Sequence, residues 1–346
     1  MTALPCKADA EKLLPKDNPD ALRLYDAVLL PAEKAAGEAT DNDATLRVMF
    51  SRIVGYLLLY PPSEQARAVL QSEVECCQGE RDQNQAVYGL GEKYVMHFIL
   101  PFFTITEETT PQPLRVEDHS RPSHESIRAS ASQGRLNSPR NLSDAKDFAL
   151  VRDNFRCMVS HASDYFALQS GILHWDSQGS PWTVAHCCHI FPEALEDVRD
   201  DKNGTINIVK NHSTALWTIL GRFGYERIHN ELSGTKIHRL ENVMTLATSI
   251  HALFRAMFLW FEKEEDGQAD CYHVGVGSPL IYEEFELPVP EKVQFVANAN
   301  LPLPNPTYLH IHASCCRIAH LSGARDHLDS IFLDEVRKTE DLDEEA

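Results

Sequence analysis

The chain has 346 residues of ordinary globular composition, enough for one large or two modest domains with cores of their own. Its formal net charge is −19, which argues against a protein that coats nucleic acid non-specifically, because such proteins need clustered Lys and Arg. The charge is uneven. Residues 146–262 contain 11 basic and 13 acidic residues, whereas residues 263–346 contain 6 and 17.

The cysteines and the apolar runs bear on the cellular compartment. There are nine cysteines, an odd number, and no C-x-x-C pair that would indicate a zinc ribbon. The first residues lack the apolar region of a signal peptide, and no apolar run is long enough to span a bilayer. We therefore expect reduced thiols, an intracellular protein of the nucleus or cytoplasm that is not secreted, and no membrane partner. The oligomeric state stays open.

Residues 1–103 are expected to form a helical N-terminal module. From residue 45 onward, apolar residues recur with a spacing near 3.6, which is typical of amphipathic helices. Pro61 and Pro62 should end the first helix, Ser63 is a suitable N-cap for the next, and a third helical stretch covers 85–103. The simplest interpretation is a packing or oligomerisation module, and a purely structural interaction protein would rest on this region alone.

The composition changes after this module. Residues 104–145 are rich in Ser, Pro, Thr and Arg and poor in large apolar residues, which predicts a flexible linker that limited proteolysis would cut first. Residues 146–335 are expected to form the main domain. Residues 336–346 form a short acidic tail.

Three segments of the main domain contain residues suited to phosphodiester chemistry. The segment 183–192, TVAHCCHIFP, combines a strand-like pattern with histidines, and 240–246, LENVMTL, places an asparagine before an apolar run. The segment 247–262, ATSIHALFRAMFLWFE, predicts an amphipathic helix with His251 in its early part. A phosphodiesterase needs a base that activates water and a cation that offsets charge, and histidine suits both tasks.

The sequence HIFP, then NVMTL, then a histidine nine positions after Asn242 resembles the HNH endonucleases of the ββα-metal superfamily. The resemblance implies that His189 is the general base at a strand end and that Asn242 orients it. His251 on the helix would ligate a divalent cation, namely Mg, Mn or Zn. It also implies an α+β fold, with a ββα-metal finger embedded in a larger mixed domain.

Further segments follow the same family in order. RDNFRCMVS (152–160) is similar to the opening of one HNH subgroup, and LWTILGRFG and LHIHASCCRIAHLSGA (309–324) are similar to its fungal members. The resemblance thus covers roughly residues 146–335. It implies metal-dependent phosphodiester hydrolysis, with DNA as the partner.

Two positions depart from the family pattern. Many members have Asp or His as a metal ligand directly before the base, where this chain has Cys188, a poor partner for Mg²⁺. Many also have Asp, Asn or His a turn after the helix histidine, where this chain has Arg255, which cannot ligate a metal but could contact phosphate. The further ligands are left open among Cys188, His186, a carboxylate and substrate oxygens. A degenerate HNH domain acting as a non-catalytic binding or regulatory module is the alternative.

Several of these residues also have simpler interpretations. Cys187 and Cys188 are more often small buried residues than ligands. A histidine such as His251 more often lies at the edge of a core. The C-terminal histidines and the Cys315–Cys316 pair favour packing in a helix over a metal cluster.

Overall fold

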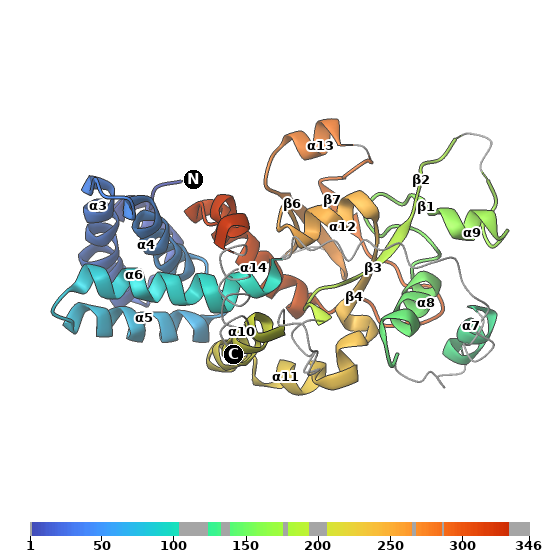
Figure 1. Ribbon diagram of the computed structural model, residues 1–346, viewed down its shortest axis with the longest axis horizontal. Helices are drawn as coiled ribbons and strands as arrows, with labels where there is room; N and C mark the ends of the chain where they lie inside the picture. The colour runs from blue at the N-terminus through green and yellow to red at the C-terminus, as the bar shows by residue number, and fades with distance from the viewer. Residues whose placement is uncertain are drawn as a thin grey trace, which may run out of the picture. The chain divides into compact units, whose positions relative to one another are not determined.

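The computed structural model has the α+β fold class that the sequence predicts, with many helices and small sheets (Figure 1). It describes residues 2–103, 124–132, 139–175, 179–193, 206–264, 268–285 and 287–331. The chain forms two compact units. The first consists of Met1–Phe103, Ala194–Asn230 and Ser314–Ala346, and the second of Thr104–Glu193 and Glu231–Ala313. Each unit is discontinuous in sequence, and the predicted 146–335 segment contributes to both.

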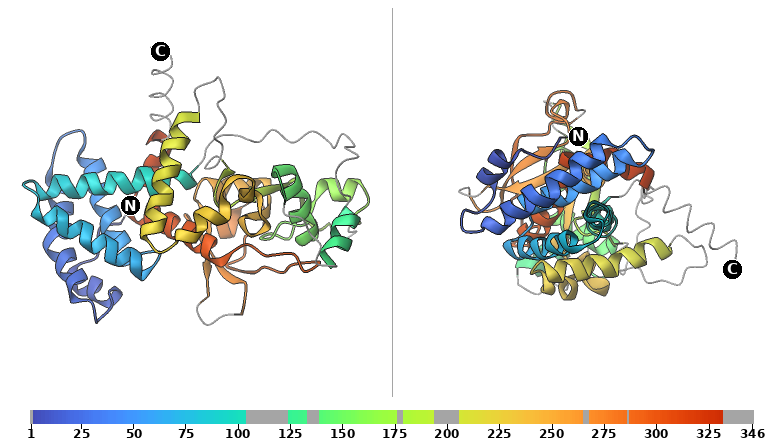
Figure 2. Two further views of the ribbon diagram at one scale, coloured as in Figure 1. Left: turned by 90° about the horizontal axis from the view of Figure 1, so that it is seen from below. Right: turned by 90° about the vertical axis from the view of Figure 1, so that its left-hand side faces the viewer.

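Helices build the first unit (Figure 2). Ser63 caps α5 by accepting a hydrogen bond from the Ala66 N–H at 2.9 Å, as its position before the helix predicts. The N-terminal elements of this unit are α1 (Lys7–Leu13), α2 (Pro19–Leu24), η1 (Tyr25–Leu29), α3 (Leu30–Glu38), α4 (Ala44–Leu59), α5 (Glu64–Gly79), α6 (Gln83–Tyr94), η2 (Val95–Ile99) and η3 (Leu100–Phe102).

Two later segments of the chain complete this unit. Helix α10 (Ile206–Arg222) packs on α5 and η2, and α11 (Glu226–Leu232) follows it. The Ser63 hydroxyl donates to the Phe223 carbonyl at 2.6 Å, and Phe223 stacks on Tyr94 with ring centroids 6.0 Å apart. These contacts explain why the 194–230 segment joins the N-terminal helices. No helix in the described part of the chain is both long and apolar enough to cross a membrane.

The second unit contains the small sheets. Its elements are α7 (His124–Ser132), α8 (Leu142–Arg152), β1 (Ser163–Asp164), α9 (Tyr165–Gln169), β2 (Trp182–Thr183), β3 (Ala185–His189), η5 (Gly234–His238), η6 (Leu240–Asn242), β4 (Val243–Ala247), α12 (Thr248–Arg255), β5 (Leu259–Lys263), β6 (Cys271–Val276), α13 (Leu280–Glu284) and β7 (Lys292–Gln294). Helix α14 (Pro306–Ser322) is divided between the two units. Strands β1 and β2 pair in parallel, and β5, β6 and β7 form an antiparallel sheet.

The antiparallel pair β3–β4 lies at the centre of the second unit. Its register pairs Ala185 with Ala247 and His189 with Val243. Because side chains alternate along a strand, Ala185 and Cys187 face the apolar cluster formed with α8. His186 instead points to the other face, where it stacks on His251 of α12. The pair is thus covered by α8 on one face and by α12 on the other.

The predicted helix over 247–262 is too long. Helix α12 ends at Arg255, Met257 has a positive φ of 59°, and the Met257 and Phe258 N–H groups bond back to Phe254 and Leu253. This is a left-handed closure of a helix end. The following apolar run then becomes strand β5, since its buried residues fit either periodicity.

The predicted linker contains ordered elements in its described part. Helix α7 lies within 104–145, and its Ile127 side chain is buried in the core of the second unit. The first residues of α8 also fall in the predicted linker, whereas its residues 104–123 and 133–138 and the predicted acidic tail 336–346 lie outside the described residues. The predicted linker and domain boundaries therefore stay predictions.

Candidate metal centre at the end of strand β3

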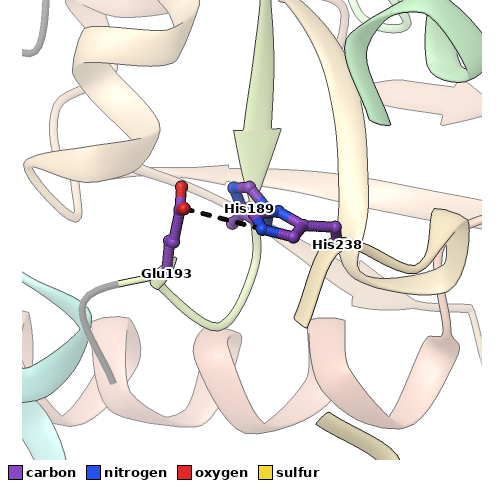
Figure 3. Close-up of side chains that lie close together, drawn as sticks. All are labelled: His189, Glu193 and His238. Atoms are coloured by element: carbon purple, nitrogen blue, oxygen red, sulfur yellow. Dashed lines mark hydrogen bonds and ion pairs between the residues drawn. The ribbon is translucent and has the colours of Figure 1, made fainter. Parts of the chain in front are cut away.

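Three side chains converge where β3 ends (Figure 3). His189 is the last residue of β3, Glu193 follows in the next loop, and His238 ends the short helix η5 before β4. His189 Nε2 lies 3.2 Å from His238 Nδ1, and His238 Nε2 lies 3.6 Å from Glu193 Oε1. Each residue offers one ligand atom within 4.8 Å of the others, close enough to hold one metal ion.

Asn242 fixes the loop that carries this cluster. Its side-chain oxygen accepts the Phe191 N–H at 2.9 Å, while its side-chain nitrogen donates to the carbonyls of Phe191 and Ile237 at 3.0 and 2.9 Å. Asn242 is fully buried, so these bonds satisfy an amide that would otherwise be costly to bury. The amide therefore ties the residue two positions after His189 to the residue directly before His238.

A buried ion pair holds the start of β4. Arg152 donates to both carboxylate oxygens of Asp153, at 2.7 and 2.9 Å, and to the carbonyls of Leu240 and Val243 at 2.8 and 2.9 Å. The Asp153 carboxylate in turn accepts the Thr245 N–H at 3.2 Å. Arg152 is completely buried and well satisfied by these partners, so it locks the end of α8 to the strand that carries Asn242 at its entry.

His251 occupies the predicted place on the helix. It lies in the first half of α12, and its ring stacks on His186 with centroids 5.3 Å apart. Its Nε2 atom is buried and has no hydrogen-bond partner in the described part of the chain. The predicted positions of His189 at a strand end and of His251 early in a helix are thus confirmed, while their catalytic and metal-binding roles stay predictions.

Burial makes the histidines of this region neutral at physiological pH. It lowers the pKa of His189 to about 3, aided by His238 and by the positive charge of Arg255. It lowers the pKa of His251 to about 3 as well, again aided by Arg255. Burial also lowers the pKa of His186 and of His238. Neutral imidazoles keep the lone pair that a proton or a metal ion requires.

Cys188 is completely buried on β3. Its thiol lies 3.6 Å from the His189 carbonyl oxygen, and burial raises its pKa far above neutrality. By strand alternation Cys188 shares the face of His186, which is the side covered by α12. A metal ion bound here would have to displace the thiol proton, which softer ions do more readily than Mg²⁺.

Residues 157–262 match the family model of the HNH endonucleases. The match supports the HNH family for this segment. The segment contains His189, Glu193, His238, Asn242 and His251. Neither the curated proteins nor the solved structures contain a match to this chain.

The sequence analysis did not identify Glu193 and His238 as site residues. Glu193 directly follows the HIFP segment and His238 precedes Asn242 by four residues, but neither position carries a periodic or motif signal of its own. Only the fold brings them together, because the intervening 194–230 segment leaves the second unit and the chain returns at 231. The one usable signal was their position next to the segments 183–192 and 240–246, which were identified for other residues.

Proposed function

We propose that this chain hydrolyses phosphodiester bonds of DNA as a metal-dependent HNH nuclease of the subgroup with fungal members. The observation that carries the proposal is the convergence of His189, Glu193 and His238 at the end of β3, within the segment that matches the HNH endonucleases. In this proposal β3, β4 and α12 constitute the ββα-metal finger, since α12 packs on both strands of the antiparallel pair.

His189 acts as the general base through its Nδ1 atom. The Glu193 carboxylate faces Nε2 of His238 at 3.6 Å and favours a proton on that nitrogen. The Nδ1 atom of His238 is then an acceptor, so the proton of His189 lies on Nε2 and the lone pair on Nδ1. Glu193 and His238 thus position a base that can take a proton from water.

Asn242 and Arg255 support this reaction in different ways. Asn242 holds the backbone after His189 and keeps the imidazole aimed. In this proposal Arg255 contacts the phosphate of the substrate, supported by the action of its positive charge on both His189 and His251.

The residues near His251 fit a divalent cation. Its buried Nε2 atom without a partner among the described residues is a nitrogen ligand in the neutral form, and Cys188 on the facing strand is the second proposed ligand. A nitrogen and sulfur donor set favours Zn²⁺ or Mn²⁺ over Mg²⁺. When bound, such an ion would stabilise negative charge at the phosphate.

The cluster itself offers a rival ligand set. His189, Glu193 and His238 could hold the ion directly, and His189 would then be a ligand rather than the base. The two assignments differ in one measurable property. Loss of His238 leaves metal affinity intact under the first and removes it under the second.

A plasmid-nicking assay with purified full-length protein tests the function. We expect nicking with Zn²⁺ or Mn²⁺ and none with a chelator. The alternative of a non-catalytic binding module is favoured by the buried thiol of Cys188, where many family members have an oxygen or nitrogen ligand. If the wild type and Cys188→Asp are equally inert with every divalent ion while DNA binding persists, the binding module is the better account.

A further inference from the structure

A cavity of the second unit lies near Trp182, at the start of the 182–189 segment that ends at His189. A cavity of about 550 Å³ opens beside the β1–β2 pair, lined by Arg156, Ser163, His174, Trp175 and Trp182 among others. Its volume is within the range of small-molecule and nucleotide sites. Strand β2 leads through a single residue into β3, so the chain connects the cavity directly with the metal centre.

Exposed aromatic rings dominate this cavity. Trp175 and Trp182 are 58% and 53% exposed, which is unusual for tryptophan. The Tyr165 ring lies 5.4 Å from the Trp182 ring at a tilt of 42°, and the two tryptophan rings meet edge to face at 6.5 Å. The three rings brace one another while leaving aromatic surface accessible to a planar ligand.

The described lining of the cavity carries one formal charge, the positive charge of Arg156. Arg156 and His174 line the cavity, and none of the described lining residues is acidic. Arg156 donates to the His161 carbonyl at 3.2 Å and has no carboxylate partner within the described ranges. Asp164 of the neighbouring strand is turned inward, where it accepts the N–H groups of Ala167 and Ala185 at 3.0 Å. The guanidinium of Arg156 is therefore available to an anion, in a chain whose net charge is otherwise −19.

We propose that this cavity binds one unstacked base of a single nucleic-acid strand, with the base on Trp182 and Trp175 and an adjacent phosphate at Arg156. Stacking on aromatic side chains combined with a nearby cation is the chemistry by which proteins hold single strands. The proposal rests on the nucleic-acid substrate of the proposed function and names the part of that substrate which is held away from the reacting phosphate. Because Trp182 precedes His189 by seven residues of nearly extended chain, the Cα atoms of these two residues lie at most roughly 23 Å apart.

The test compares two labelled single strands of equal length, an oligothymidylate and an abasic strand with the same phosphates. Binding to the full-length protein is followed by fluorescence anisotropy in the presence of a chelator, so that no cleavage is needed. Wild type should bind the oligothymidylate more tightly than the abasic strand. Trp182→Ala and Trp175→Ala should each weaken oligothymidylate binding by about ten-fold and leave abasic binding unchanged.

Matched variants separate the two parts of the site. Arg156→Gln should weaken binding of both strands alike and lower the salt dependence by about one phosphate contact. Trp217→Phe, in the other compact unit, should change nothing. Thermal melting of each variant checks folding. Trp175→Ala is the safeguard here, because its side chain lies in a loop and is the more exposed of the two tryptophans.

The outcomes distinguish this proposal from the nuclease itself. Three results would each overturn the base site, whatever the nicking assay shows. These are equal binding of the two strands by wild type, no binding of either strand, and tryptophan variants that bind like wild type. Tryptophan-dependent binding by a protein that nicks no DNA would leave the base site standing and remove only the hydrolysis.

Discussion

The segment from Trp182 to His189 begins and ends in opposite environments. At its start, Trp182 is about half exposed and meets other aromatic rings at the surface. At its end, His189 is 5% exposed, contacts a second histidine and directly precedes a loop fixed by a buried amide. Ligand binding needs accessible surface, whereas proton transfer needs groups held in one orientation with little water. One short stretch of chain therefore supplies two environments that suit different tasks.

The largest effect is expected at the buried end. His189→Ala should reduce plasmid nicking by about 10²–10⁴-fold, because the proposed base is removed. Its affinity for Zn²⁺ or Mn²⁺, measured by calorimetry, should stay close to that of wild type. His273→Ala is the matched control, because it removes a half-exposed histidine of β6. Equal nicking by His189→Ala and His273→Ala would contradict the catalytic role.

Metal affinity decides which groups of the buried end hold the ion. His251→Ala should lose both metal binding and nicking, because it removes the proposed nitrogen ligand. That nitrogen has no hydrogen-bond partner among the described residues. His238→Ala should keep metal affinity and lower nicking by about ten-fold or more, since it only orients the base. The reverse pattern of affinities would assign the ion to the His189, Glu193 and His238 cluster.

The positions of these residues show how far sequence reasoning reaches. His189, Asn242 and His251 could be placed because their order and neighbours resemble a known pattern, and their local elements follow from strand and helix periodicity. The length of α12 could not be predicted from the sequence. The apolar residues of β5 continue the helical pattern past Met257, whose left-handed backbone ends the helix. Glu193, His238 and the tryptophan cavity depend on contacts between distant segments, which periodicity does not encode.

Stability should also depend on the polar network around this end. Arg152→Met should lower the free energy of unfolding by about 3–5 kcal/mol, because it leaves the buried Asp153 carboxylate without its cation. Arg140→Met removes an exposed partner of Asp144. It should change the free energy of unfolding by less than about 1 kcal/mol. Urea unfolding measures both, and similar values for the two variants would refute the structural role of Arg152.

A further effect on stability concerns pH. Burial lowers the pKa of His312, which stacks on Phe254 of α12 at 4.0 Å, to about 3. The unfolded chain, with a histidine pKa near 6.5, takes up a proton below that pH while the folded protein does not. Stability should therefore be fully present above pH ~6.5 and be lost as the pH falls toward ~3, by up to about 1.4 kcal/mol per pH unit for this group.

His312→Gln isolates this contribution from those of the other buried histidines. Its urea midpoint should fall less than that of wild type between neutral pH and pH ~5, because one group that protonates on unfolding is gone. An identical pH dependence for the two proteins would show that His312 takes no part.

The pairing of β3 with β4 has a consequence for how the protein reaches its native state. The paired residues Ala185 and Ala247, and His189 and Val243, are separated by more than fifty positions, and the segment between them joins the other compact unit. Closing so long a loop costs entropy before any contact compensates it, and long-range pairing of this kind slows folding. During synthesis, β3 with its two cysteines must therefore wait for the whole intervening segment to emerge. The His189 end of β3 should be among the last parts of the newly made chain to assemble, and refolding rates should respond to the length of that segment.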